Sequence, residues 1–148
     1  MSRLSRRALL SAGIAACALP VSRAKARPAR LLFAGPGGIE LSAGPTHIQL
    51  IGAIDEQIPR DNRIHLRLDD VTVCRAPNVA YGVYLDGMRC AGTLRFGGGS
   101  RSFDVTALLR DLERAGPLGD RLVVSLVPHG TPDPRAAPRI GGLYLVAA

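Results

Sequence analysis

The sequence predicts an all-β fold, an antiparallel β-sandwich of seven or eight short strands with one short helix. Two observations predict the sandwich. Apolar and polar residues alternate along many short segments, and glycine, proline or Asp-Gly turns end most of these segments. The alternating segments begin at Ile48, Ile64, Tyr81, Leu94, Leu122 and Ile140. This two-residue period is typical of strands with one buried face in an antiparallel sheet.

One segment has the period of a helix instead. Its apolar residues are Val105, Leu108, Leu109 and Leu112. Asp104 or Thr106 can cap its first turn, and Gly116-Pro117 ends it. We expect a helix at about residues 105–115 that lies across one end or edge of the sandwich.

The first 26 residues have the order of a twin-arginine signal peptide. The paired Arg6 and Arg7 precede an apolar run at residues 8–19, and the small residues Ala24 and Ala26 mark a cleavage position. The run is shorter than the about 20 residues of a membrane-spanning helix. The alternative is a soluble helix with a basic start. The signal predicts a periplasmic or secreted protein, exported in the folded state, that meets the membrane only during export.

A second alternative concerns the same segment. Residues 14–17 end in Cys17 and loosely resemble the box in which a cysteine becomes the lipidated first residue of a lipoprotein. Modification of Cys17 would leave the protein anchored by lipid. After the signal, residues 27–44 are rich in glycine and proline and form either an ordered strand or a loose arm. Residues 45–148 form the sandwich domain.

The positive charge of the chain lies mostly in the signal. The formal net charge is +7, but residues 1–26 hold five of the 19 basic groups and no acidic group. The remaining chain has 14 arginines against 12 acidic residues. This balance excludes the basic surface that nucleic-acid-binding domains need.

The sequence contains no complete catalytic or metal motif. His47, His65 and His129 are far apart, whereas a catalytic zinc site needs three clustered ligands. We expect histidines that face solvent or form hydrogen bonds, with a weak metal contact as the alternative. The prediction is therefore a protein that is not an enzyme and binds no cofactor stably, although transient copper binding is possible.

Two cysteines follow the signal. Cys90 is in phase with Leu94 and is expected to face the core, whereas Cys74 is in phase with Thr72 and is expected to face outward. If residues 66–74 and 79–88 form one hairpin, the cysteines lie on the order of 35 Å apart, and a disulfide tolerates less than about 7 Å between Cα atoms. Two separate thiols are favoured, and a disulfide remains the alternative.

Five segments resemble, in order, the C-terminal domain of polyphenol oxidases and bacterial tyrosinases. They are residues 80–86 (AYGVYLD), 91–96 (AGTLRF), 102–112 (SFDVTALLRDL), 122–128 (LVVSLVP) and 140–145 (IGGLYL). The resemblance extends from about Ile64 to Val146. It departs from the family at residues 80–82, where Ala-Tyr-Gly replaces Lys-Phe-Asp, and the sequence lacks the copper domain that precedes this module in the family.

The resemblance implies a non-catalytic accessory subunit or chaperone of a secreted, tyrosinase-like type-3 copper oxidase. In that family the module shields the copper site, and separate bacterial caddie proteins help copper loading and export. Alternatives are a periplasmic copper carrier or a free-standing extracellular binding sandwich. Candidate residues for partner contact are Tyr81, Tyr84, Asp86, Met88 and Phe96, with a core role as the alternative for Tyr81. Cys74 and Cys90 are the candidate thiol or metal ligands.

Overall fold

The structure is a computed structural model that describes residues 29–52, 60–75, 79–87 and 89–148. Arg6, Arg7, Cys17, Ala24, Ala26 and Met88 lie outside these ranges. The strands are β1 (Arg30–Ala34), β2 (Ile39–Glu40), β3 (Thr46–Gly52), β4 (Ile64–Thr72), β5 (Tyr81–Leu85), β6 (Arg89–Leu94), β7 (Arg101–Asp104), β8 (Arg121–Pro128) and β9 (Arg139–Ala147). The helices are α1 (Thr106–Ala115) and the short 3-10 helix η1 (Pro134–Ala136).

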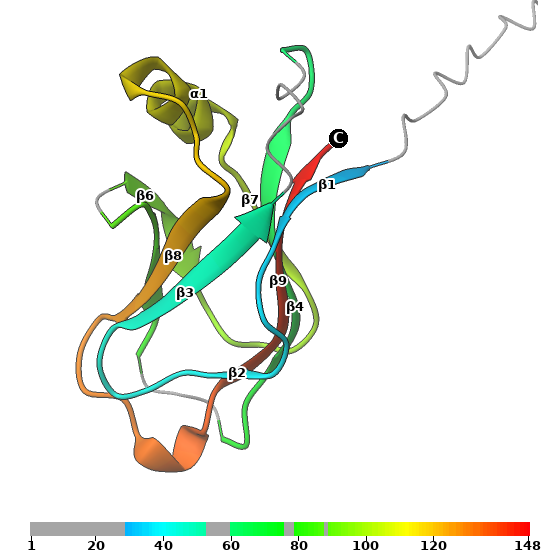
Figure 1. Cartoon of the computed structure of the whole chain (residues 1–148). Coiled ribbons are helices and arrows are strands. Elements are labelled where there is room, and N and C mark those ends of the chain that lie inside the picture. The colour runs from blue at the N-terminus through cyan, green and yellow to red at the C-terminus, as the bar shows by residue number, and fades with distance from the viewer. Residues whose placement is uncertain (1–28, 53–59, 76–78, 88) are drawn as a thin grey trace, which may run out of the picture.

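The nine strands form one antiparallel sheet that curls until it is nearly closed (Figure 1). The strand order is β6-β5-β8-β3-β1-β9-β4-β7, and β2 pairs with β9 outside this path. The predicted all-β antiparallel fold with one short α-helix is confirmed. There are nine strands rather than seven or eight because residues 27–44 contain β1 and β2. Of the two alternatives for this segment, the structure has the ordered strand.

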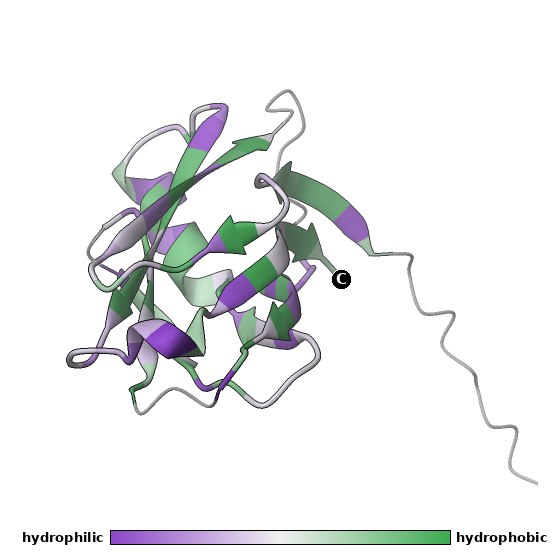
Figure 2. Ribbon diagram, turned by 90° about the horizontal axis from the view of Figure 1, so that it is seen from below, coloured by the Kyte–Doolittle hydropathy of each residue, from purple (hydrophilic) through white to green (hydrophobic). Residues whose placement is uncertain are grey.

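The core fills the inside of the curled sheet. Along β4, Ile64, Leu66 and Leu68 are completely buried, and the intervening residues point outward. Leu143 and Leu145 of the neighbouring β9 are buried in the same way. Figure 2 shows the apolar segments concentrated on the strands. Each such side chain stabilises the fold by about 1.5–3 kcal/mol through the apolar area it removes from water.

The two end strands of the sheet, β6 and β7, meet through a side chain. A Cβ atom on Gly92 of β6 would lie 2.7 Å from Cδ1 of Phe103 on β7. The phenyl ring therefore occupies the space that any other residue at position 92 would need. This contact brings the ends of the sheet together without a ladder of hydrogen bonds between them.

The α-helix begins where β7 ends and lies at one end of the sheet (Figure 1). Oδ1 of Asp104 accepts hydrogen bonds from the Thr106 hydroxyl at 2.6 Å and from the Thr106 N–H at 3.0 Å. Leu109 is the buried residue of the helix, and the Gly116 N–H donates to the Leu112 carbonyl as the helix ends. The predicted helix is confirmed, but neither predicted residue is its N-cap: Val105 holds that position without a side-chain cap hydrogen bond, Thr106 is the first helical residue, and Asp104 binds Thr106 from the end of β7.

Substitution of Gly92 tests the contact that closes the sheet. Gly92→Ala forces the Phe103 ring away and also puts a Cβ atom on a backbone with φ +156°, so it is expected to lower the free energy of unfolding by about 1–3 kcal/mol, measured by urea denaturation. Gly116→Ala is the control, because a Cβ atom there meets no atom within 4 Å. Its stability should stay within about 0.5 kcal/mol of the parent. Equal stability of the two variants would contradict the role of Phe103.

The Asp104 carboxylate makes the stability of the helix start depend on pH. Hydrogen bonds from the Thr106 hydroxyl and N–H, with smaller contributions from the charges of His65 and Arg63, hold the pKa of Asp104 below its ordinary value. Because the folded-state pKa is depressed, the stabilisation is complete above the unfolded pKa of about 3.9 and disappears as the pH falls through the folded value.

Asp104→Ala removes the acceptor of the two hydrogen bonds from Thr106 and is therefore expected to cost about 1 kcal/mol of unfolding free energy at neutral pH. The difference from the parent protein should shrink below about pH 4. Asp104→Asn keeps an acceptor without the charge and should lose less. A difference between parent and Asp104→Ala that stays constant down to acid pH would show that the carboxylate charge plays no part. Thermal unfolding over a pH series measures both effects.

Candidate partner-contact face

Four strands that are distant in sequence place one row of side chains on the outside of the sheet. The cross-strand pairs are His47↔Ser125 between β3 and β8, Ser125↔Tyr84 between β8 and β5, and Tyr84↔Cys90 between β5 and β6. Their inward neighbours, such as Val83 of β5, are buried. The row therefore faces away from the core.

A hydrogen bond ties the first two members of the row. Nδ1 of His47 lies 2.7 Å from Oγ of Ser125. Ser125 is only 3% exposed although it belongs to the outer face. The hydroxyl of Ser125 thus has a partner, and the bond fixes the imidazole ring of His47 against β8.

A second histidine joins the row through a glycine. A Cβ atom on Gly82 would lie 2.7 Å from Cε2 of Tyr84 and 2.8 Å from Nε2 of His129. Both rings therefore lie over the backbone of Gly82, and the absence of a side chain there lets them approach each other. We call His47, Ser125, Tyr84, Cys90 and His129 together the tyrosine face.

The composition of the tyrosine face suits contact with another protein. It contains a tyrosine, two imidazoles, a hydroxyl and a thiol, and no Asp, Glu, Lys or Arg. Protein interfaces are depleted of charged residues at their centre and enriched in aromatic residues. Tyrosine also contributes a large area at a low cost in conformational entropy, because it has few rotatable bonds.

Searches against family models and against curated proteins find no match. Solved structures do match. The structure of latent apple tyrosinase has a TM-score of 0.56 and 17% sequence identity, covering 75% of this chain and 27% of the enzyme. A latent aurone synthase (polyphenol oxidase) has a TM-score of 0.50 and 15% identity, covering 71% of this chain and 25% of the enzyme.

The fold is that of a polyphenol oxidase domain. The chain spans about a quarter of the length of the solved enzymes that it matches. The resemblance predicted from the sequence is therefore confirmed at the level of the fold.

Two of the predicted contact residues belong to the interior. Tyr81 is completely buried, and its hydroxyl donates a long hydrogen bond of 3.4 Å to the Ser42 carbonyl. Burial also raises the pKa of Tyr81 above its ordinary value. Phe96 is partly buried and packs edge-on against the Tyr81 ring, with 5.6 Å between ring centroids. Tyr81 thus has the core role given as its alternative, and Phe96 supports it.

Asp86 is exposed, but it lies in the turn rather than on the tyrosine face. Asp86 and Gly87 have φ values of +50° and +77°, which fits the turn expected from the Asp-Gly pair. The N–H of Asp86 donates to the Val123 carbonyl at 2.8 Å, and the residue lines a shallow hollow beside the end of α1. Of the predicted contact residues that the structure describes, Tyr84 alone belongs to the tyrosine face.

The expectation that Cys90 faces the core is wrong. Val83 pairs with Gly92 but Tyr84 pairs with Cys90, so Ala91 is an extra residue in β6. A bulge of this kind shifts the alternation by one, which turns the Cys90 side chain to the outer face. Both Cys74 and Cys90 are free and exposed.

The hairpin used to separate the cysteines is also wrong, because β4 pairs with β7 and β9 rather than with β5. Cys74 follows β4, and its N–H donates to the Ala136 carbonyl of η1.

Within the described ranges no three His, Cys, Asp or Glu side chains gather as metal ligands. Nor is any helix there long and apolar enough to cross a membrane.

Sequence reasoning named His47 and His129 as histidines that face solvent or form hydrogen bonds, but it did not place them or Ser125 on a contact face. His47 lies on the polar phase of its strand, which indicated an outward direction, and it is exposed and hydrogen-bonded as expected. The sequence contains no signal that His47, Ser125 and Tyr84 come together, because their strands become neighbours only in the folded sheet.

The two exposed thiols provide a direct check of the bulge in β6. In protein that lacks residues 1–26, and therefore Cys17, we expect a disulfide reagent such as Ellman's to titrate both Cys74 and Cys90 without denaturant. Cys90→Ser should remove one of the two reactive groups. If the second thiol reacts only after unfolding, Cys90 is buried as the alternation predicted, and the bulge in β6 is contradicted.

Proposed function

We propose that this protein is a non-catalytic accessory subunit that binds and shields a tyrosinase-like type-3 copper oxidase. The observation that carries the proposal is the fold match to about a quarter of two enzymes, both solved in a form described as latent. A domain of this fold that binds an oxidase would cover it as the corresponding C-terminal domain covers the copper domain in the family that the sequence resembles.

The tyrosine face supports the proposal as the contact surface. It has uncharged side chains held in place by a hydrogen bond and by ring packing over Gly82. A surface that is already ordered loses little conformational entropy when it binds, which favours affinity. The large aromatic group of Tyr84 lies at its centre, next to Ser125 on one side and Cys90 on the other.

The proposal includes an escort role in export and a transient role in copper loading. The twin-arginine signal predicted at residues 1–26 suits a protein that leaves the cell folded, alone or with a bound partner. The thiol of Cys90 is exposed, and a thiolate is a suitable soft ligand for copper. This role needs a brief contact rather than a stable site.

Co-expression with a tyrosinase-type oxidase of the same organism tests the proposal. We expect the two proteins to copurify, the bound oxidase to be less active than the free one, and the copper content of the oxidase to fall when this chain is omitted. Tyr84→Ala is expected to weaken the complex about tenfold or more, as removal of a central aromatic residue does. Titration calorimetry measures the affinity.

Tyr144→Ala is the matched control. The Tyr144 ring lies over Gly142 on β9 as the Tyr84 ring lies over Gly82 on β5, so both substitutions remove the same kind of packing. Tyr144 lies between Ala34 and Arg67, four strands away from β5. We expect the oxidase to bind this variant like the parent. Absence of a complex with the parent protein would overturn the proposed function.

A further inference from the structure

Strand β3 has a partner on both sides for only part of its length. On one side β8 pairs with it from Thr46 to Ile51. On the other side β1 pairs with it only at Ile51 and Gly52. The remaining part of that second edge is open.

The direction of the main-chain groups follows from one hydrogen bond. The Gly52 N–H donates to the Asp120 carbonyl at 3.1 Å, on the β8 side. Because N–H and C=O groups alternate between the two sides of a strand, the other even-numbered residues of β3 also bond to β8. The odd-numbered residues point the other way. Ile51 meets Ala34 of β1 there, but among the described residues no strand pairs with His47 or Gln49 on this side.

The open edge forms one wall of a groove. After Ala34 the chain leaves β3 but continues along β9, where the Gly35 N–H donates to the Leu143 carbonyl at 2.8 Å and the Gly38 N–H to the Gly141 carbonyl at 3.1 Å. The divergence leaves a groove of about 710 Å³ between β3 and the segment from Pro36 to Ile39.

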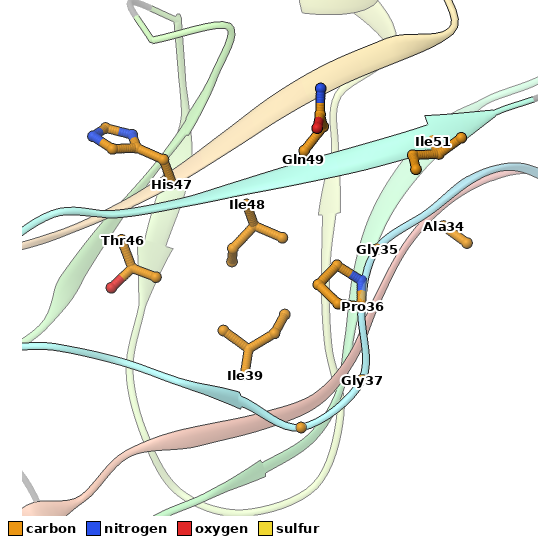
Figure 3. A pocket seen from close by; sticks show the side chains of 11 residues that line it. Ala34, Gly35, Pro36, Gly37, Ile39, Thr46, His47, Ile48, Gln49 and Ile51 are labelled. Atoms are coloured by element: carbon orange, nitrogen blue, oxygen red, sulfur yellow. The ribbon is translucent and has the colours of Figure 1, made fainter.

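Figure 3 shows how the groove is built. Ile39 and Ile48 point toward each other across it, and Pro36 lies at one end. The side chains of His47 and Gln49 point away from the groove, so their main-chain groups form its wall. Among the residues that the structure describes, no Asp, Glu, Lys or Arg lines the groove.

These properties specify the occupant. Two N–H and two C=O groups in a row match the main chain of an extended peptide, and the apolar floor excludes a charged side chain at the inward positions. Exposed strand edges are usually protected by charges, by proline or by a covering segment. Residues 46–50 of β3 include no Asp, Glu, Lys, Arg or proline. An edge without these protecting residues is suited to receive a partner strand.

We propose that the groove binds an extended, uncharged segment of the oxidase partner as an additional strand on β3. This inference rests on the proposed function. His47 connects the two surfaces, because its side chain belongs to the tyrosine face and its main chain to the groove wall. A partner that covers the tyrosine face therefore reaches the groove as well. The open stretch of five residues, 46–50, accommodates about 16 Å of strand.

The free protein already gives a first test. Amide hydrogen exchange measured by NMR should alternate along β3, with His47 and Gln49 exchanging faster than Ile48 and Leu50. Binding of the oxidase should slow the exchange of His47 and Gln49. Slow exchange of both amides in the isolated protein would overturn the inference, because it would show that the edge is already paired.

Gln49→Pro tests the edge in the complex. Proline removes the N–H that faces the groove and leaves the β3–β8 ladder intact, because edge strands tolerate proline where the N–H points away from the sheet. We expect the affinity for the oxidase to fall about tenfold or more, corresponding to the loss of a main-chain hydrogen bond and the obstruction of its neighbours.

Ser102→Pro is the matched control. Ser102 is an exposed residue of the end strand β7, and the donation from the Val105 N–H to the Ile64 carbonyl places the Ser102 N–H on the side away from β4. This variant should bind the oxidase like the parent. Equal affinities of Gln49→Pro and Ser102→Pro would overturn the inference while leaving the proposed function intact.

A probe peptide separates this inference from the identity of the partner. At saturating concentration, acetyl-Thr-Val-Thr-Val-Thr-amide should slow exchange at His47 and Gln49 but not at Ile48. The same peptide with Asp in place of Val should not slow exchange at either residue.

If no oxidase binds the parent protein, the proposed function fails, but protection by the Thr-Val peptide would still support a strand-binding groove. Failure of both the peptide and the oxidase to protect these amides overturns the groove. Dimerisation that Gln49→Pro abolishes would instead assign the groove to a second copy of this chain.

Discussion

The two-residue period of the strand determines both of the proposed contact surfaces of this molecule. Side chains alternate between core and outside, and main-chain groups alternate between one neighbouring strand and the other. In β3 the first alternation places Ile48 and Leu50 in the core and His47 outside. The second alternation directs the main chain of His47 and Gln49 to the open edge. The tyrosine face and the groove are thus two consequences of one register.

The open edge of β3 depends on strand pairing elsewhere in the sheet. The β4–β9 ladder is the longest in the sheet, from Ile64↔Ala147 to Thr72↔Arg139, and its inward residues are completely buried. A slip of one residue would expose all of them to water. Because β1 pairs with both β9 and β3, the position of β9 fixes β1 and, through it, the place where β3 is left open.

The sequence predicted what depends on local pattern. The alternation along β4 and β9, the helical spacing at Leu108, Leu109 and Leu112, and the Asp86-Gly87 turn each depend on a few neighbouring residues, and the structure contains all of them. Strand order and bulges depend on distant partners. The extra residue Ala91 turns Cys90 outward, and nothing in residues 89–94 alone reveals it. The groove could not be predicted from the sequence either, because it depends on the residue at which β1 stops pairing with β3.

The contrast between Tyr84 and Tyr144 shows what makes one outward tyrosine a candidate contact. Both rings cover a glycine two residues earlier in the strand, so the local sequence pattern is the same. Tyr144 has Arg67 as a cross-strand neighbour, and that guanidinium is engaged by Asp69 at 2.7 Å. A partner covering Tyr144 would have to desolvate this ion pair, which costs free energy. Tyr84 instead has Ser125 and Cys90 beside it, uncharged groups that lose far less when water is removed. The neighbours brought by the sheet, rather than the tyrosine itself, distinguish the two sides of the molecule.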